Sequence, residues 1–150
     1  MKKRFKIYLG ADHAGFNLKE ELKTYFSKIG INYEDLGGKG DQDDDYSDYA
    51  FAVAKKVSRE KNAKGILICG TGTGMVIAAN KARGVRAAVG YDGYSARMAE
   101  EDNNVNILCL RGRKFSDSKN LKLIKIWLTS RFSGLERHKR RLRKIERYER

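Results

Sequence analysis

A glycine-rich segment with a cysteine at its head is the part of the sequence best suited to chemistry. Cys69 ends an apolar run, and Gly70, Gly72 and Gly74 follow it. Glycine lets the backbone approach a ligand closely, and N–H groups at the start of a helix stabilise negative charge. The helix dipole also lowers the pKa of a nearby thiol, so Cys69 could be a thiolate base or nucleophile. The alternative is a buried cysteine that fills a strand end, and the residues alone favour neither.

Three familiar anion-binding loops fit this segment badly. Gly70 is followed by Thr71, whereas a Walker loop needs Gly-Lys-Ser/Thr. A dinucleotide fingerprint would follow the first strand, and Met75 occupies the position of its last glycine. Met75 also stands where a cysteine phosphatase would need an arginine. An oxyanion cradle with an adjacent base therefore remains.

Polar residues elsewhere could complete such a site. Asp12 and His13 follow the first strand and would flank Cys69 if the first and third strands are neighbours. Asp12 could equally cap a helix, and His13 could be an exposed turn residue. Arg137 and Arg141 have i, i+4 spacing near the end of the chain, so their guanidinium groups point the same way and could clamp a phosphate. A solvated basic face is the alternative for these arginines.

The elements that must position these residues alternate along the chain. The pattern predicts strands at 4–10, 32–36, 65–70, 86–90 and 106–110, with helices at 18–29, 49–57, 75–81, 94–101, 121–132 and 135–149. This alternation is typical of a doubly wound α/β sheet, where ligands bind beyond the carboxyl ends of the strands. We expect three segments there, namely 10–15, 69–74 and 102–104. The last, very basic helix has a thin apolar stripe, so we expect it to pack on a partner subunit.

Composition narrows the class of protein. The 150 residues suit one domain, 1–150, and no apolar run approaches the ~20 residues that span a bilayer. We expect no signal peptide and, with only Cys69 and Cys109 in apolar runs, no disulfide framework or metal pair. A reduced, cytoplasmic protein is predicted. Residues 1–110 carry 17 basic and 15 acidic residues, whereas residues 111–150 carry 15 and 4, so the net charge of +13 is concentrated at the end of the chain.

Together these segments resemble one family, the type B ribose-5-phosphate isomerases, grouped with the galactose-6-phosphate isomerase subunits. The resemblance spans nearly the whole chain and is carried by four segments: GADHAGFNLKEEL (10–22), DYSDYA (45–50), GILICGTGTGMVIAANKARGVRAA (65–88) and NNVNILCLRGR (103–113). It implies a Rossmann-like three-layer α/β/α sandwich with a five-stranded parallel sheet. It also implies a homodimer, often a tetramer, whose active sites lie at the subunit interface.

The family's chemistry is a cofactor-free, metal-free aldose–ketose isomerisation through an enediolate. The resemblance implies that Cys69 is the base and that Thr71 assists it. The backbone of 70–74, together with Asn103, would stabilise the enediolate oxygen. The substrate would be held by the following residues: Asp12 at the sugar hydroxyls, Tyr46 along the sugar pocket, and His13, Arg113, Arg137 and Arg141 at the phosphate.

One position departs from the family pattern. The residue before Asn103 is usually a histidine, to which ring opening is assigned, and here it is Asp102. An aspartate accepts a proton readily but is a poor donor at neutral pH. His13 and His138 are the only histidines, and neither is near Asp102 in sequence. We therefore expect slow turnover of cyclic ribose 5-phosphate with retained proton exchange on open-chain ribulose 5-phosphate. A smaller departure is Ser47, where the family usually has proline.

The sequence thus predicts interconversion of D-ribose 5-phosphate and D-ribulose 5-phosphate, a reaction of the pentose phosphate pathway. Isomerisation of a six-carbon sugar phosphate, allose or galactose 6-phosphate, is the first alternative. The second is a binding protein for sugar phosphate or nucleic acid that has lost turnover. We expect a phosphorylated sugar as the ligand, and neither a membrane nor nucleic acid as a partner.

Overall fold

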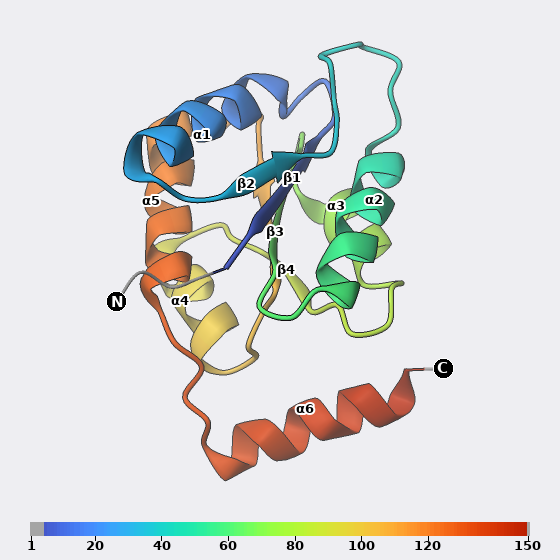
Figure 1. The fold of residues 1–150 in the computed structure, drawn as a ribbon, viewed down its shortest axis with the longest axis vertical. Coiled ribbons are helices and arrows are strands. Elements are labelled where there is room, and N and C mark those ends of the chain that lie inside the picture. The colour runs from blue at the N-terminus through green and yellow to red at the C-terminus, as the bar shows by residue number, and fades with distance from the viewer. Residues whose placement is uncertain (1–4, 150) are drawn as a thin grey trace.

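Five parallel strands form the sheet at the centre of the molecule (Figure 1). The computed structural model describes residues 5–149. The strands are β1 (Ile7–Ala11), β2 (Tyr33–Asp35), β3 (Lys64–Cys69), β4 (Ala87–Val89) and β5 (Ile107–Arg111). They lie in the order β2-β1-β3-β5-β4. The expected five-stranded parallel sheet is confirmed, although β1 begins at Ile7 and Arg4, the expected first residue, lies outside the described residues.

Helices cover both faces of the sheet, which confirms the three-layer α/β/α sandwich. The helices α1 (Phe16–Ile29), α4 (Gly93–Glu101) and α5 (Asp117–Thr129) lie on one face, and α2 (Tyr46–Arg59) and α3 (Thr73–Ala79) on the other. Alternate residues of β3 serve the two layers: Ile66 and Ile68 pack with α1 and α5, while Leu67 and Cys69 pack with α2 and α3. Because both faces are covered, the central strand is apolar along nearly its whole length.

The last helix, α6 (Glu136–Tyr148), belongs to neither layer and lies along the edge of the sheet where the strands begin (Figure 1). His138 and Leu142 are its buried residues. The Glu149 carboxylate accepts the Gly84 N–H at 3.0 Å, which ties the far end of α6 to the loop before β4. Ile145 and Tyr148 stay 49% and 85% exposed, so part of the apolar stripe of α6 is uncovered in one chain.

The helix predicted for 121–132 is displaced. It begins at Asp117 and ends at Thr129, so Phe132 lies in the linker to α6. Two hydroxyl residues lie at this end. Thr129 Oγ1 donates to the Lys125 carbonyl at 2.8 Å and Ser130 Oγ to the Ile126 carbonyl at 2.7 Å, although Ile126 O also accepts the Ser130 N–H at 3.0 Å. A hydroxyl that bonds to the carbonyl four residues earlier destabilises a helix slightly, which favours an end here.

Candidate active site

The ends of β1 and β3 lie side by side and bring Asp12 next to the cysteine strand. Ala11 pairs with Ile68, and the Asp12 N–H donates to the Ile68 carbonyl at 3.2 Å. The adjacency assumed from sequence is therefore confirmed. Asp12 is not the N-cap of α1, a position that Gly15 takes. Its buried carboxylate accepts the N–H groups of Ala14 and Gly15 at 2.9 and 3.2 Å. Burial raises the pKa of this carboxyl, and the two backbone bonds offset only part of the effect.

Cys69 lies buried at the last position of β3. Its Sγ accepts the N–H of Gly72 at 3.2 Å. Gly72 adopts φ of +82° and stands where a Cβ would lie 3.2 Å from the Leu110 carbonyl oxygen, so a glycine suits this turn. Cys109 is also buried, and burial raises the pKa of its thiol well above the ordinary value, with the neighbouring Cys69 adding to the effect. Of the two thiols, only Cys69 meets the glycine loop.

Side chains pack against the glycine loop, residues 70–74, on two sides. A Cβ on Gly74 would lie 2.6 Å from the Tyr46 ring, and one on Gly70 would lie 3.1 Å from Nη1 of Arg113. Tyr46, the first residue of α2, and Arg113, which follows β5, are therefore packed against the same loop. The Thr71 hydroxyl is exposed and lies 2.7 Å from that of Thr73. The loop thus lies between an aromatic ring and a guanidinium group.

His13 lies between an acid and an arginine. Its Nδ1 is 2.7 Å from Asp44 Oδ1, which also accepts the His13 backbone N–H at 3.0 Å. Its Nε2 faces Nη2 of Arg113 at 3.3 Å. The Tyr49 hydroxyl donates to the second oxygen of Asp44 at 3.2 Å. Burial alone would raise the pKa of Asp44, but the bonds from His13 and Tyr49 outweigh it and hold that pKa below its ordinary value.

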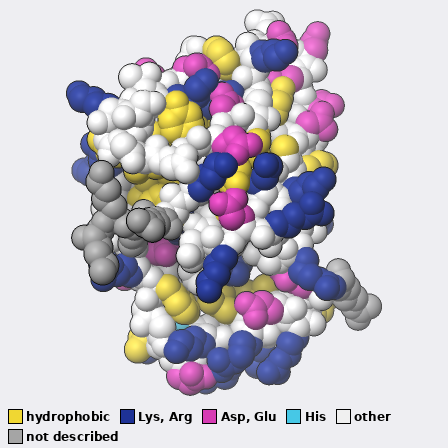
Figure 2. All heavy atoms as spheres, viewed as in Figure 1, with side chains coloured by type: hydrophobic (Ala, Val, Ile, Leu, Met, Phe, Trp, Pro, Cys, Tyr) yellow, Lys and Arg dark blue, Asp and Glu magenta, His cyan; other side chains and the backbone are white. Residues whose placement is uncertain are grey.

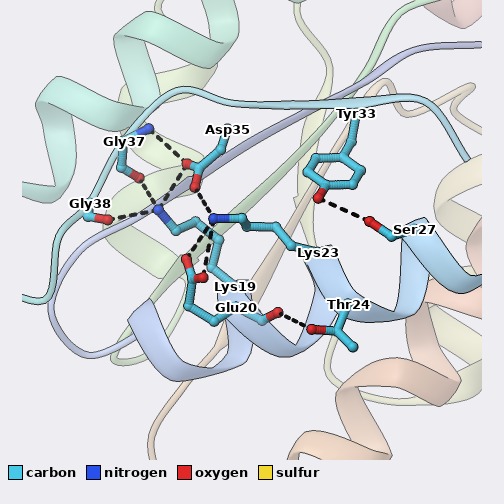
Figure 3. Close-up of polar contacts among 9 residues, drawn as sticks. All are labelled: Lys19, Glu20, Lys23, Thr24, Ser27, Tyr33, Asp35, Gly37 and Gly38. Atoms are coloured by element: carbon cyan, nitrogen blue, oxygen red, sulfur yellow. Dashed lines mark hydrogen bonds and ion pairs between the residues drawn. The ribbon is translucent and has the colours of Figure 1, made fainter.

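Nothing in the sequence distinguishes Asp44, which is one of several acids between residues 41 and 45. The only available signal was that this acidic loop precedes Tyr46. The loop itself is fixed by Lys19, whose side chain is 1% exposed. Its Nζ donates to Asp35 Oδ1 at 2.8 Å and to the carbonyls of Gly37 and Gly38 at 2.8 and 2.7 Å (Figure 3). A buried ammonium group thus holds the start of the loop that carries Asp44 and Tyr46.

These residues make up what we call the carboxyl-edge cluster, at the edge where β1, β3 and β5 end: Asp12, His13, Tyr46, Cys69, Gly70, Thr71, Gly72, Gly74 and Arg113. The cluster can supply a thiol base, backbone donors for an oxyanion, and a guanidinium group with a neighbouring imidazole for a phosphate.

The remaining predicted site residues lie elsewhere, and the expectation that 102–104 lies at the carboxyl ends of the strands is wrong. This segment precedes β5, so it lies at the opposite edge of the sheet from Cys69. Asn103 lines a cavity there together with Ala87, Leu142 and Ile145. Residues before a parallel strand necessarily lie at its amino end. The same edge carries α6 (Figure 1), and we call the following set the amino-edge cluster: Asp102, Asn103, Arg137, His138 and Arg141.

One polar contact joins two members of the amino-edge cluster. His138 Nε2 lies 3.5 Å from Asp102 Oδ1, and its Nδ1 lies 2.7 Å from the Ser133 hydroxyl. Arg137 and Arg141 are exposed on α6 beside this histidine. Figure 2 shows Lys and Arg side chains gathered along α6 and hydrophobic side chains where the helix meets the body. A single chain therefore presents two groups of predicted site residues at opposite edges of the sheet.

No group of three or more His, Cys, Asp or Glu side chains among residues 5–149 is arranged to hold a metal ion. Within the same range, no helix has the length and apolar character needed to cross a membrane.

Comparison with known proteins places these features in context. A family model described as Ribose/Galactose Isomerase matches residues 7–145. Ribose-5-phosphate isomerase B of Escherichia coli is 37% identical over 140 residues, covering 93% of each chain. The Mycobacterium tuberculosis protein of that name is 34% identical over 146 residues, covering 97% of this chain and 90% of that protein.

A solved structure gives a further comparison. The crystal structure of ribose-5-phosphate isomerase B from Mycoplasma genitalium, with bound ribulose 5-phosphate, is similar with a TM-score of 0.94. It is 42% identical, and the alignment covers 97% of each chain.

Proposed function

The chain belongs to the ribose/galactose isomerase family, and from that premise we propose that it is an aldose–ketose isomerase that interconverts D-ribose 5-phosphate and D-ribulose 5-phosphate. The observation that carries the proposal is the Cys69 thiol, which accepts the Gly72 N–H at 3.2 Å at the head of the glycine loop. A base and fixed oxyanion donors are what proton transfer beside a carbonyl requires.

The reaction moves one proton between C1 and C2 of the open-chain sugar. Cys69 as thiolate removes the C2 proton, and the electrons of that bond form the enediolate while the charge develops on O1. The loop N–H groups of 70–74 stabilise this oxygen, and Thr71 assists the thiol. Cys69 then returns a proton to C1, and transfer of the O2 proton to O1 forms the C2 carbonyl and the C1 hydroxyl of the ketose.

The rest of the carboxyl-edge cluster holds the substrate. The buried Asp12 carboxylate contacts sugar hydroxyls, and the Tyr46 ring lines the sugar pocket. His13 and Arg113, which lie 3.3 Å apart, bind the phosphate. Arginine suits this role because its guanidinium group donates two parallel hydrogen bonds to a phosphate.

The amino-edge cluster reaches this site from a second subunit. A two-fold axis pairs one edge of a chain with the opposite edge of its partner, and it does so twice, as isologous interfaces require. Asn103 of the partner subunit then completes the oxyanion donors, and Arg137 and Arg141 of the partner subunit complete the phosphate site. The partly uncovered apolar stripe of α6, with Ile145 and Tyr148, supports this homodimer, and two dimers can associate further into a tetramer.

The substrate class has one rival. The matching family model covers both ribose and galactose isomerases, so a six-carbon sugar phosphate such as allose or galactose 6-phosphate is the second candidate. The chemistry at C1 and C2 is the same for both. Only the length of the pocket between Cys69 and the phosphate groups distinguishes them.

Proton NMR in D₂O tests the proposed reaction. Purified protein with ribose 5-phosphate should form ribulose 5-phosphate and place deuterium at C2 of the recovered aldose. Allose and galactose 6-phosphate are run in parallel, and faster turnover of either assigns the six-carbon substrate. A folded protein that binds these sugars without conversion or labelling would contradict the proposal and favour the non-catalytic reading.

Subunit mixing tests the shared site. Cys69→Ser and Arg137→Ala/Arg141→Ala each disable a different half of every site. In a mixed dimer one site collects both lesions and the other is intact, so random exchange should restore about a quarter of wild-type activity. If mixing restores nothing while mixed dimers form, each site is built from one chain.

A further inference from the structure

Asp44 is a carboxylate to which the proposed function gives no task, and it holds His13 at two points. Its Oδ1 lies 2.7 Å from Nδ1 of the His13 ring and accepts the His13 backbone N–H at 3.0 Å. The Asp44 side chain is 10% exposed, and that of His13 is 28% exposed. The carboxylate is therefore the more buried partner, and the imidazole lies between it and Arg113.

The second oxygen of Asp44 is also occupied. The hydroxyl of Tyr49, a residue of α2, donates to Oδ2 at 3.2 Å. Burial would raise the pKa of Asp44, but the hydrogen bonds from His13 and Tyr49 hold that pKa below its ordinary value. Asp44 is therefore an ionised carboxylate at neutral pH, and its orientation is fixed through both oxygens.

The His13 ring carries one proton in this structure. Nε2 lies 3.3 Å from Nη2 of Arg113, and a guanidinium group only donates hydrogen bonds, so Nε2 is the acceptor. The ring proton is then on Nδ1 and is directed at Asp44. A ring in this tautomer has no N–H left for a phosphate, whose oxygens accept hydrogen bonds. His13 can bind the phosphate through Nε2 only after a second proton has joined the ring.

We propose that Asp44 is a positioning residue that makes His13 take up a proton when the substrate phosphate binds, an inference that rests on the proposed function above. A proton from the solvent joins Nε2, and the new N–H donates to a phosphate oxygen. Nδ1 keeps its own proton and its bond to Asp44. The imidazolium ring then lies between two anions, the carboxylate and the phosphate, while Arg113 also donates to the phosphate.

The charges around His13 explain why the second proton arrives with the ligand. Asp44, from the loop before α2, and Asp12, at the end of β1, favour a positive ring. Arg113, which follows β5, opposes it, as do the arginines Arg137 and Arg141 that the proposed dimer brings from the partner subunit. The Asp12 carboxylate is committed to the N–H groups of Ala14 and Gly15, so Asp44 is the anion in direct contact with the ring. A phosphate dianion adds the negative charge that the unliganded site lacks.

Calorimetry measures the proton directly. Ribitol 5-phosphate is the probe, because it carries the phosphate but has no carbonyl to isomerise. At about pH 8 its phosphate is already a dianion, so the ligand itself releases no proton. Titrations in buffers of different ionisation enthalpy give the number of protons taken up, as the slope of the observed enthalpy against that of the buffer. The wild-type protein should take up between about half a proton and one proton per site.

Three variants assign this proton. Asp44→Asn keeps the shape of the side chain, and its amide oxygen still accepts the His13 backbone N–H, so the fold is retained and only the charge is lost. Proton uptake should fall close to zero in Asp44→Asn and in His13→Gln. Asp43→Asn is the matched control, because it removes an equal charge from an exposed position of the same loop. It should take up the same number of protons as the wild type.

Steady-state kinetics give an independent readout. The KM of the wild type for ribose 5-phosphate should rise between about pH 7 and pH 9, because the proton needed for binding becomes scarcer. Asp44→Asn should start with a KM that is ~10-fold higher at pH 7, the loss of one charge-assisted bond, and its KM should then change little with pH. The kcat of this variant should stay within ~3-fold of wild type, since the phosphate is bound equally before and during proton transfer.

Three outcomes would overturn the inference. Binding of ribitol 5-phosphate to the wild type without proton uptake would show that the ring does not become a cation. Uptake that persists in Asp44→Asn would remove Asp44 from this role, and uptake that persists in His13→Gln would assign the proton to another group. Failure of the proposed function would look different, since the wild type would then bind no phosphosugar and form no ribulose 5-phosphate.

Discussion

Nη2 of Arg113 lies 3.3 Å from Nε2 of His13, although the residues are 100 positions apart. Arginine only donates hydrogen bonds, so Nε2 accepts and the Nδ1 proton faces Asp44 at 2.7 Å. Both side chains are thus preoriented at the carboxyl edge. A phosphate entering beside them would accept a charge-assisted hydrogen bond from the Arg113 guanidinium.

The phosphate assignment predicts matched effects from two distant arginines. Arg113→Ala and Arg141→Ala should each raise KM for ribose 5-phosphate by ~10–100-fold, the loss of one charge-assisted bond, with a smaller change in kcat. Steady-state kinetics on the two variants measure this. Arg140→Ala serves as the control, because helical periodicity places it away from the buried face that contains His138 and Leu142. An unchanged KM in Arg141→Ala would show that Arg141 does not bind the phosphate and belongs to a solvated basic face of α6.

Cys69→Ser tests the base. A serine hydroxyl fits the same space and can accept the Gly72 N–H, but it is far less acidic than a thiol. We expect an unchanged fold by circular dichroism and a fall in kcat of ~10²–10⁴-fold. Cys109→Ala is the thiol control: it removes a buried core group and should retain turnover. Near-normal kcat in Cys69→Ser would eliminate the thiol as the base.

Asp12→Asn should lower the activity and raise the stability of the protein. Burial raises the pKa of the folded-state carboxyl above its unfolded value, so the ionised group costs stability as pH rises through the folded-state pKa. Asparagine avoids the charge and still accepts the N–H groups of Ala14 and Gly15. Thermal unfolding should therefore show a higher Tm than wild type at pH 7, a difference that vanishes below about pH 4. A lower Tm at pH 7 would mean that the backbone bonds to the carboxylate outweigh its desolvation.

Lys19→Met tests the buried ammonium group that fixes the acidic loop. The change leaves the carbonyls of Gly37 and Gly38 without their donor and weakens the field that lowers the pKa of Asp35. Urea unfolding should show a loss of ~3–5 kcal/mol, the usual cost of breaking a buried pair.

Lys23→Met is the matched control, because Lys23 also pairs with Asp35 but is 28% exposed. It should cost less than ~1 kcal/mol. The lowered pKa of Asp35 also means that its stabilising contribution, present above the ordinary carboxyl pKa, is lost as pH falls through the folded-state value. Equal losses in the two lysine variants would show that burial of Lys19 adds nothing.

The sheet and the carboxyl-edge cluster could be predicted because local rules determine them. Apolar runs bounded by glycine mark buried parallel strands, and residues after such strands meet at one edge. Cys69 and Asp12 follow from those rules. The role of Lys19 could not be found in this way: its spacing to Leu22 and Phe26 places it at the border of the apolar face of α1, but its partners Gly37 and Gly38 are set by the path of the chain.

The prediction of where Asp102 lies was wrong for a different reason. Asp102 is close to β5 in sequence, but the direction of the strand places the residues before it at the other edge of the sheet from Cys69. Its contact with His138 crosses from α4 to α6 and has no periodicity that a sequence would reveal. Asp44 likewise has no local feature that separates it from its acidic neighbours, because its partner His13 lies 31 positions away.

The placement of the two clusters at opposite edges has a consequence for how activity scales with the amount of protein. In the proposed homodimer, a lone chain holds two incomplete sites and an associated pair holds two complete ones. Well below the dissociation constant of the dimer, complete sites accumulate with the square of the chain concentration. Halving the supply of chain would then remove about three quarters of the catalysis, a steep response obtained without any effector.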